Sequence, residues 1–220
     1  ISWIKGVDTD STASTKPNRA TIMGDTMHSK PLVINYGAST PSGTPDLRII
    51  TGTNSGFLHM FKDAGDTVSE TWAYIPYPLL KNQATLKAAS IAVDHISGID
   101  GSPVSYVVDK NSDGQILSST TGDKAWVFVG QRQGGRSYYA LNVTNPDSPS
   151  LKWIITGGTT TGFSRLGQTW STPQVTKIPG YKDDSGNYKP VLVFAGGYDT
   201  NKDAATIGTS DATGNAIYFV

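Results

Sequence analysis

Short runs of hydrophobic residues recur along this chain in an order that repeats three times, with Gly, Pro, Asn, Asp or Ser between them. The runs are rich in Val, Ile, Phe, Tyr and Trp, which suit a pleated surface with packed faces, and the intervening residues mark turns. They are 29–33, 48–52, 56–61 and 70–74, then 102–104, 126–130, 138–143 and 152–155, then 171–175, 192–196 and 215–219. We therefore predict short antiparallel strands, four in each of the first two repeats and three in the last.

Corresponding residues such as Pro31, Pro103 and Pro173 lie about 70 residues apart. A fixed period indicates an array, because one such unit cannot bury its own apolar face. Four antiparallel strands per unit are typical of a β-propeller blade. The predicted fold class is all-β, a β-propeller of quinoprotein-like blades present as a partial array. Its predicted parts are a lead-in or edge segment at 1–23 and blades at 24–76, 100–157 and 168–220, the last incomplete.

Trp72 and Trp153 occupy matching places on the fourth strands, where we expect them to pack between neighbouring blades. The period exceeds the usual length of about 40–50 residues, and the excess lies in loops, one of which predicts a short helix within 79–89. Closure generally needs at least about four blades. Since only two units are whole, we expect the sequence to be part of a longer protein.

The composition excludes several function classes. Eighteen Lys and Arg balance 18 Asp and Glu, which gives no basic footprint for nucleic acid. The chain contains no Cys, so disulfides and cysteine nucleophiles are ruled out. No stretch approaches the roughly 18 apolar residues of a transmembrane helix. The three His residues show no metal-binding spacing on a helix, and no nucleophile motif occurs, so we expect no enzymatic activity.

The segment 109–116 carries the clearest candidate for chemistry. Asp109, Asn111 and Asp113 place oxygen ligands at alternating positions, a glycine follows for the tight turn, and Gln115 offers a backbone carbonyl. Hard cations such as Ca²⁺ take six to eight oxygen ligands, and loops of this spacing supply them. The twelfth position is Thr120 rather than a glutamate, although Asp123 lies close by in sequence. We predict a Ca²⁺ site here, with a solvated Asp/Asn/Gly turn as the alternative.

A weaker metal candidate has the same spacing near the end of the chain. Asp199, Asn201 and Asp203 alternate, but Ala204 stands where the turn glycine is expected. For this segment a structural turn is the favoured interpretation.

Taken together, several segments resemble the propeller domain of the PilC/PilY family, the type IV pilus biogenesis factors and tip-associated adhesins. The segments are 24–33, 52–61, 72–76, 100–103, 134–136, 138–144 and 194–198. The resemblance spans about nine-tenths of the chain, and it rests on the order and spacing of the motifs, because each one alone is ordinary propeller sequence.

The resemblance implies an exported protein of a Gram-negative bacterium, at the outer membrane, cell surface or pilus tip, or in the periplasm. It implies pilins and minor pilins as partners, with a host or abiotic surface as a further one. It also implies roles in pilus extension and retraction, in attachment and in twitching motility. The family has a calcium loop that Asp109, Asn111 and Asp113 match, whereas Leu117 stands where the last Asp of that loop is expected.

Two other functions remain open at this point. Quinoprotein dehydrogenases with a PQQ-type cofactor also place a Gly-x-Leu-x-x-Phe motif and a tryptophan in each blade, and they would need a catalytic aspartate near the central channel. An outer-membrane scaffold propeller is the other alternative.

Overall fold

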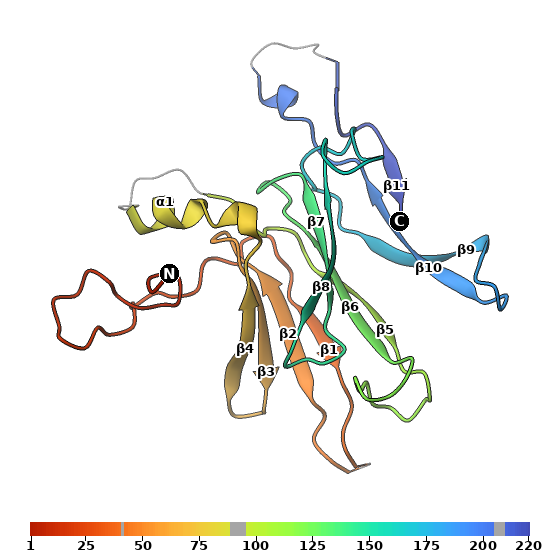
Figure 1. The fold of residues 1–220 in the computed structure, drawn as a ribbon, viewed down its shortest axis with the longest axis horizontal. Coiled ribbons are helices and arrows are strands. Elements are labelled where there is room, and N and C mark those ends of the chain that lie inside the picture. Colours follow the sequence, from red (N-terminus) through yellow and green to blue (C-terminus); the bar gives the residue numbers. More distant parts are fainter. Residues whose placement is uncertain (41, 89–95, 205–209) are drawn as a thin grey trace.

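The computed structural model describes residues 1–40, 42–88, 96–204 and 210–220, and its strands form three antiparallel sheets (Figure 1). Sheet 1 contains β1 (Leu32–Asn35), β2 (Leu47–Gly52), β3 (Leu58–Asp63) and β4 (Val68–Tyr74). Sheet 2 contains β5 (Val104–Val108), β6 (Lys124–Gly130), β7 (Ser137–Asn142) and β8 (Ser150–Thr156). Sheet 3 contains β9 (Gln174–Lys182), β10 (Tyr188–Ala195) and β11 (Ile217–Phe219). The predicted all-β class is confirmed.

Strands that follow one another in sequence are also neighbours in each sheet, so every sheet is an up-and-down meander. Helical structure is limited to 3₁₀ turns at Tyr77–Leu79 and Thr200–Asp203 and to α1 at Asn82–Ala88, within the segments that the structure describes. The helix predicted in 79–89 is therefore present, although residue 89 lies outside the described residues. None of the described helices is long and apolar enough to span a lipid bilayer.

Sheet 2 is buried on both faces because it lies between the other two sheets. Along β6, Val127 and Val129 belong to the core shared with sheet 1, which includes Ile50 and Met60. Phe128 points the opposite way, into a second core shared with sheet 3. Successive side chains of a strand alternate between faces, so a strand covered on both sides has a continuous apolar run. This explains the sequence from Ala125 to Val129.

Polar groups join sheets 1 and 2 across the first core. The Trp72 indole donates to the backbone oxygen of Pro146 at 2.9 Å, and the Tyr36 hydroxyl donates to that of Val143 at 2.6 Å. Trp72 packs on the first core and Trp153 on the second, so the predicted packing of these tryptophans between neighbouring units is present between the sheets. Large aromatic rings with a bonded polar tip combine apolar burial with a defined orientation.

The first strands of neighbouring sheets lie against each other, β1 beside β5 and β5 beside β9. From this line of contact the sheets fan apart (Figure 1). Across the described residues, the three sheets form neither a closed ring nor a solenoid. The propeller therefore stays a prediction, while the division into repeated sheet modules is present in the structure.

The segment 1–23 lies beside the outer face of sheet 1, the face that points away from sheet 2. Its Ile4 and Ile22 line a shared pocket with Phe57 and Phe61. Within the segment, Val7 and Asn18 form an isolated antiparallel bridge. The Asp10 carboxylate forms an ion pair with Lys87 of α1 at 3.0 Å, which connects the segment to the rest of the structure. The domain boundaries given above stay predictions.

Candidate functional site

The loop at 109–116, which follows β5 and which we call the acidic loop, adopts the tight turn that its sequence predicts. The Asp109 Oδ2 atom accepts a hydrogen bond from the Gly114 backbone N–H at 2.8 Å, and Asp113 Oδ1 accepts one from Gln115 at 2.8 Å. Ser112 and Gly114 have φ angles of 59° and 79°, the left-handed values that a reversal of this kind requires. These bonds arrange the side chains of the loop locally, without help from distant residues.

The donor set of this loop fits a hard cation in chemistry. Asp109 Oδ1 is buried and has no hydrogen-bond partner among the described residues, and burial of such an oxygen is costly unless something charged or polar meets it. Asn111 and Asp113 lie side by side, since the amide Nδ2 donates to Asp113 Oδ2 at 2.8 Å. Asp123 lies near the loop, but its carboxylate accepts from the backbone of Lys110 and Leu117.

No cluster of three or more His, Cys, Asp or Glu that could hold a metal occurs among the described residues. The loop brings the Asn111 amide and the Asp113 carboxylate into contact, and further ligands of a cation would be Asp109, backbone oxygens such as that of Gln115, or water. The Ca²⁺ site therefore stays a prediction.

The second half of the loop is anchored to sheet 1. The Ile116 N–H donates to the Tyr36 oxygen at 3.0 Å, and the Ile116 side chain is buried in the first core. A Cβ at Gly37 would lie 2.0 Å from the Gly114 oxygen, so only glycine allows the two turns to approach so closely. The loop is therefore in direct contact with the β1–β2 hairpin.

The second metal candidate is organised differently. Asp199 is buried, and its carboxylate accepts hydrogen bonds from the N–H groups of Asn201, Ala212 and Thr213. These bonds, that from Asn201 foremost, hold the pKa of Asp199 below its usual range. Asp203 Oδ1 accepts from the Tyr198 hydroxyl at 2.6 Å. This arrangement matches the structural turn favoured from the sequence.

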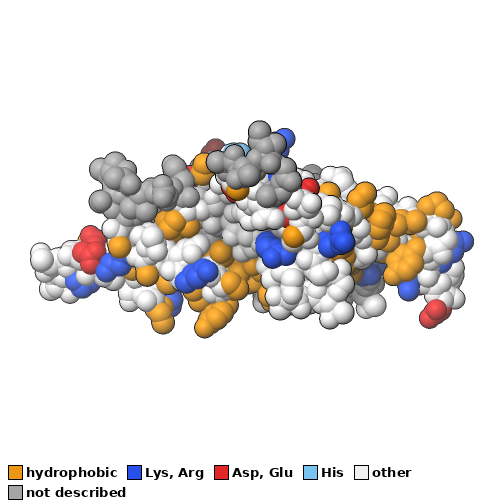
Figure 2. Space-filling view, turned by 90° about the horizontal axis from the view of Figure 1, so that it is seen from above, with side chains coloured by type: hydrophobic (Ala, Val, Ile, Leu, Met, Phe, Trp, Pro, Cys, Tyr) orange, Lys and Arg blue, Asp and Glu red, His pale blue; other side chains and the backbone are white. Residues whose placement is uncertain are grey.

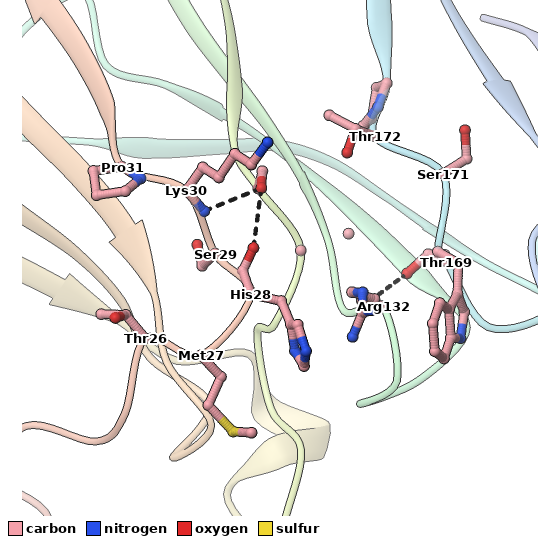
Figure 3. A pocket seen from close by; sticks show the side chains of 15 residues that line it. Thr26, Met27, His28, Ser29, Lys30, Pro31, Arg132, Thr169, Ser171 and Thr172 are labelled. Atoms are coloured by element: carbon pink, nitrogen blue, oxygen red, sulfur yellow. Dashed lines mark hydrogen bonds between the residues drawn. The ribbon is translucent and has the colours of Figure 1, made fainter.

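A pocket that the sequence did not predict lies where the three sheets meet (Figure 3). We call it the three-sheet pocket; its volume is about 640 Å³. It is lined by the segments that precede the first strand of each sheet and by the end of β6. These residues are Thr26, Met27, His28, Ser29, Lys30, Pro31, Gly101, Ser102, Gly130, Arg132, Thr169, Trp170, Ser171, Thr172 and Pro173.

Asp100 organises the charged side of the three-sheet pocket. Its side chain is 4% exposed, and its Oδ2 atom accepts from Arg132 Nη1 at 2.9 Å. The His28 Nδ1 atom lies 2.9 Å from the same oxygen. The Arg132 guanidinium also lies over the Trp170 ring, 4.1 Å from its centre. A buried carboxylate thus holds a basic residue from each of two sheets.

Serine hydroxyls repeat beside this pocket with the period of the sequence. Ser29 Oγ accepts from the Gly52 N–H at 2.8 Å, and Ser171 Oγ accepts from Ala195 at 3.1 Å. Ser102 acts between sheets instead, accepting from the Lys30 N–H at 3.1 Å and donating to the His28 oxygen at 3.2 Å (Figure 3). The repeated Ser and Pro before each first strand was the signal from which the pocket could have been found.

Strained backbone conformations occur in the acidic loop and at the three-sheet pocket. In the described part of the chain, the residues other than glycine with positive φ are Met27, Ser112 and Arg132. Ser112 lies in the acidic loop, and the other two line the three-sheet pocket. Unfavourable backbone conformations of this kind persist where the surrounding structure holds them, often at functional sites.

No family model matches the chain. It is 29% identical to the type IV pilus biogenesis factor PilY1 of Pseudomonas aeruginosa (strain UCBPP-PA14) over 86% of its length, and 28% identical to the PilY1 homologue of Xylella fastidiosa over 89%. PilY1 of Pseudomonas aeruginosa strain PAK matches at 28% over 99%. The chain spans only 16%, 14% and 18% of the lengths of these relatives.

Among solved structures, the chain is similar to a crystal structure of the Pseudomonas aeruginosa PilY1 C-terminal domain. The TM-score is 0.47 at 26% sequence identity, with 72% of this chain and 26% of that chain covered.

Proposed function

We propose that this chain, a homologue of the type IV pilus biogenesis factors named PilY1, acts without catalysis in type IV pilus biogenesis and adhesion. The observation that carries the proposal is the alignment with PilY1 proteins over 86% to 99% of the chain. The expected resemblance to the PilC/PilY family is thereby confirmed. The share of each relative that is covered is small, so the role of the whole protein is part of the proposal.

We further propose that the three sheets are blades of a β-propeller with the three-sheet pocket near its axis. The contacts of β1 with β5 and of β5 with β9 support this, because the innermost strands of neighbouring blades meet near the axis of a propeller. Sheet 3 leaves Ile217 and Phe219 exposed at 67% and 64%. Hydrophobic side chains gather at the end of the molecule that carries β9 to β11 (Figure 2). A further blade packed on this face would cover them.

The acidic loop is proposed as the Ca²⁺ site, held by Asp109, Asn111 and Asp113 with the Gln115 carbonyl. Bound Ca²⁺ would supply positive charge that offsets the mutual repulsion of the two carboxylates. Ordering of the loop by Ca²⁺ would also affect sheet 1, because Ile116 and Gly114 contact the β1–β2 hairpin. A loop ordered by a cation would fix the edge of sheet 1 and the surface beside it.

In this proposal the protein is exported and works at the outer membrane, cell surface or pilus tip, or in the periplasm. Its partners are pilins and minor pilins, and its outer surface contacts a host or abiotic surface. It would act in the balance between pilus extension and retraction, in attachment and in twitching motility.

The pilus role is tested by deleting the gene for the whole protein in its own bacterium and restoring it in trans. We expect fewer surface pili and smaller twitching zones in the deletion strain, and recovery with the wild-type gene. Normal piliation and normal twitching in the deletion strain would refute the role.

The Ca²⁺ site is tested separately by isothermal titration calorimetry of the protein with Ca²⁺. We expect binding heat that Asp113→Ala abolishes and that Asp66→Ala, in the exposed β3–β4 turn, leaves unchanged. The absence of heat with the wild-type protein would end the calcium part and leave the pilus part standing.

A further inference from the structure

The three-sheet pocket has an excess of positive charge. Lys30, Arg132 and His28 are among the residues that line it, and no Asp or Glu is. Asp100 lies behind them at 4% exposure, where it meets one nitrogen of Arg132 and one of His28. The Lys30 side chain forms no ion pair in the described segments. One hidden carboxylate therefore faces two permanent positive charges and a histidine, which leaves a net attraction for an anion.

Arg132 is held in a fixed position by groups outside the pocket. Asp100 accepts from Nη1, the Trp170 ring lies against the guanidinium, and the backbone N–H donates to Thr169 Oγ1 at 3.0 Å. Its Nε and Nη2 atoms donate to none of the described residues. A guanidinium anchored on one side presents the rest of its planar array of donors, which matches the two oxygens of a carboxylate.

The remaining walls indicate a ligand larger than a bare ion. A volume of about 640 Å³ falls within the range of about 300–1,000 Å³ that small-molecule sites occupy. Met27, Pro31 and Pro173 supply apolar surface, while the hydroxyls of Thr26 and Thr172 have no partner among the described residues. Figure 3 shows Met27 and Thr172 around the same opening as His28, Lys30 and Arg132. Such walls suit a compound with a carboxylate at one end and a hydroxylated, partly apolar body.

We propose that the three-sheet pocket binds a small hydroxylated organic acid of the size of one sugar acid. Arg132 binds its carboxylate, Lys30 adds attraction by charge, and the hydroxyls of Thr26 and Thr172 bind its body. Met27 and Arg132 have left-handed backbone conformations, which persist only where the surrounding structure holds such residues in place. The pilus role assigns no such ligand, so the two proposals stand independently.

The test is a titration of the protein with galacturonate, followed by isothermal titration calorimetry and by the tryptophan fluorescence, to which Trp170 beside Arg132 contributes, with matched ligands in parallel. We expect galacturonate to bind and galactose, which lacks the carboxylate, to bind at least about tenfold more weakly, because a hydrogen-bonded charge contributes that much. Equal binding of the two, or no binding of galacturonate, would overturn the proposal. Inorganic phosphate that binds more tightly than galacturonate would overturn the assignment to a carboxylate.

Variants decide whether the pocket is the binding site. Arg132→Gln and Lys30→Gln are each expected to weaken galacturonate binding about tenfold or more. Lys30→Gln is the cleaner of the two, since Arg132→Gln also removes a partner of the buried Asp100. The control is Arg165→Gln, an exposed arginine outside the pocket that donates to Asn215 at 3.1 Å. If Lys30→Gln binds like the Arg165→Gln control in a folded protein, the site is refuted.

Discussion

Replacement of Arg48 by methionine tests how the first two sheets are joined. The Arg48 side chain is 2% exposed, and its guanidinium bonds Asp46 through two nitrogens, at 2.5 Å and 2.8 Å. Its Nη1 atom reaches Asp147, in the turn between β7 and β8, at 2.8 Å, and Thr71 at 2.9 Å. Arg48→Met keeps an apolar stem of similar length and removes every one of these bonds.

The size of the effect follows from the exposure of each partner. Asp46 is 30% exposed, so its paired charge-assisted bonds contribute about 2–3 kcal/mol. Asp147 is 69% exposed, and its pair with Arg48 contributes about 0–1 kcal/mol. We expect Arg48→Met to lower the free energy of unfolding by about 3 kcal/mol, which corresponds to a fall in Tm of about 6–12 °C. Asp147→Asn should lower it by less than about 1 kcal/mol.

Urea unfolding at several pH values measures both variants. Hydrogen bonding to Arg48 lowers the pKa of Asp46, so the pair stabilises the fold above the carboxyl's unfolded pKa of about 4. This contribution is lost as the pH falls through the lowered, folded-state pKa, and the gap between wild type and Arg48→Met should narrow there. A variant as stable as wild type at pH 7, or a gap that widens in acid, would refute the reasoning.

Three further predictions concern the packing of the sheets. Leu141→Ala, at 1% exposure between sheets 1 and 2, should cost about 2–5 kcal/mol in urea unfolding, and Leu151→Ala, at 47% exposure, less than about 1; equal losses would contradict the assigned core. Gly37→Ala should lower the free energy of unfolding clearly more than Gly65→Ala, because both glycines have positive φ but, of the two, Gly37 alone has a backbone oxygen where the new Cβ would lie. Equal Tm values of the two variants in thermal melts would contradict the contact between the acidic loop and the β1–β2 hairpin. Burial raises the pKa of Tyr139 to about 12, so this tyrosine stabilises the fold fully below about pH 10 and progressively less above it. Absorbance titration should show the ionisation of Tyr139 near pH 12, and ionisation near pH 10 in the folded protein would contradict its burial.

Much of the fold could be predicted from the sequence because its signals are local. Each strand of sheets 1 and 2 overlaps a predicted apolar run, closely at Lys124–Gly130, whereas β1 and β5 begin later than the runs predicted at 29–33 and 102–104. Arg48 was not predictable in this way. A charged residue in a strand normally indicates an exposed position, and here its burial depends on Asp147, which lies far away in sequence and on another sheet.

The two candidate sites differ in the same respect. The turn at Asp109 could be predicted because its bonds join residues only a few positions apart, as between Asp109 and Gly114. The repeated Ser and Pro marked the segments around the three-sheet pocket, but its charged cluster could not be predicted, since His28 and Asp100 are 72 positions apart and Arg132 comes from a third segment. No spacing within one repeat encodes such a meeting, and it becomes visible only when the sheets are placed side by side.

The central claim is that the sheets converge at their first strands, around the three-sheet pocket, and diverge toward their last. The chain has no cysteine, so nitroxide labels on introduced cysteines report single pairs of positions by pulsed electron paramagnetic resonance. One labelled protein carries Val33→Cys and Val107→Cys, on β1 and β5, and the other carries Val68→Cys and Leu151→Cys, on β4 and β8; all four positions are exposed. We predict a shorter distance for the first pair than for the second. An equal or longer distance for the first pair would contradict the account.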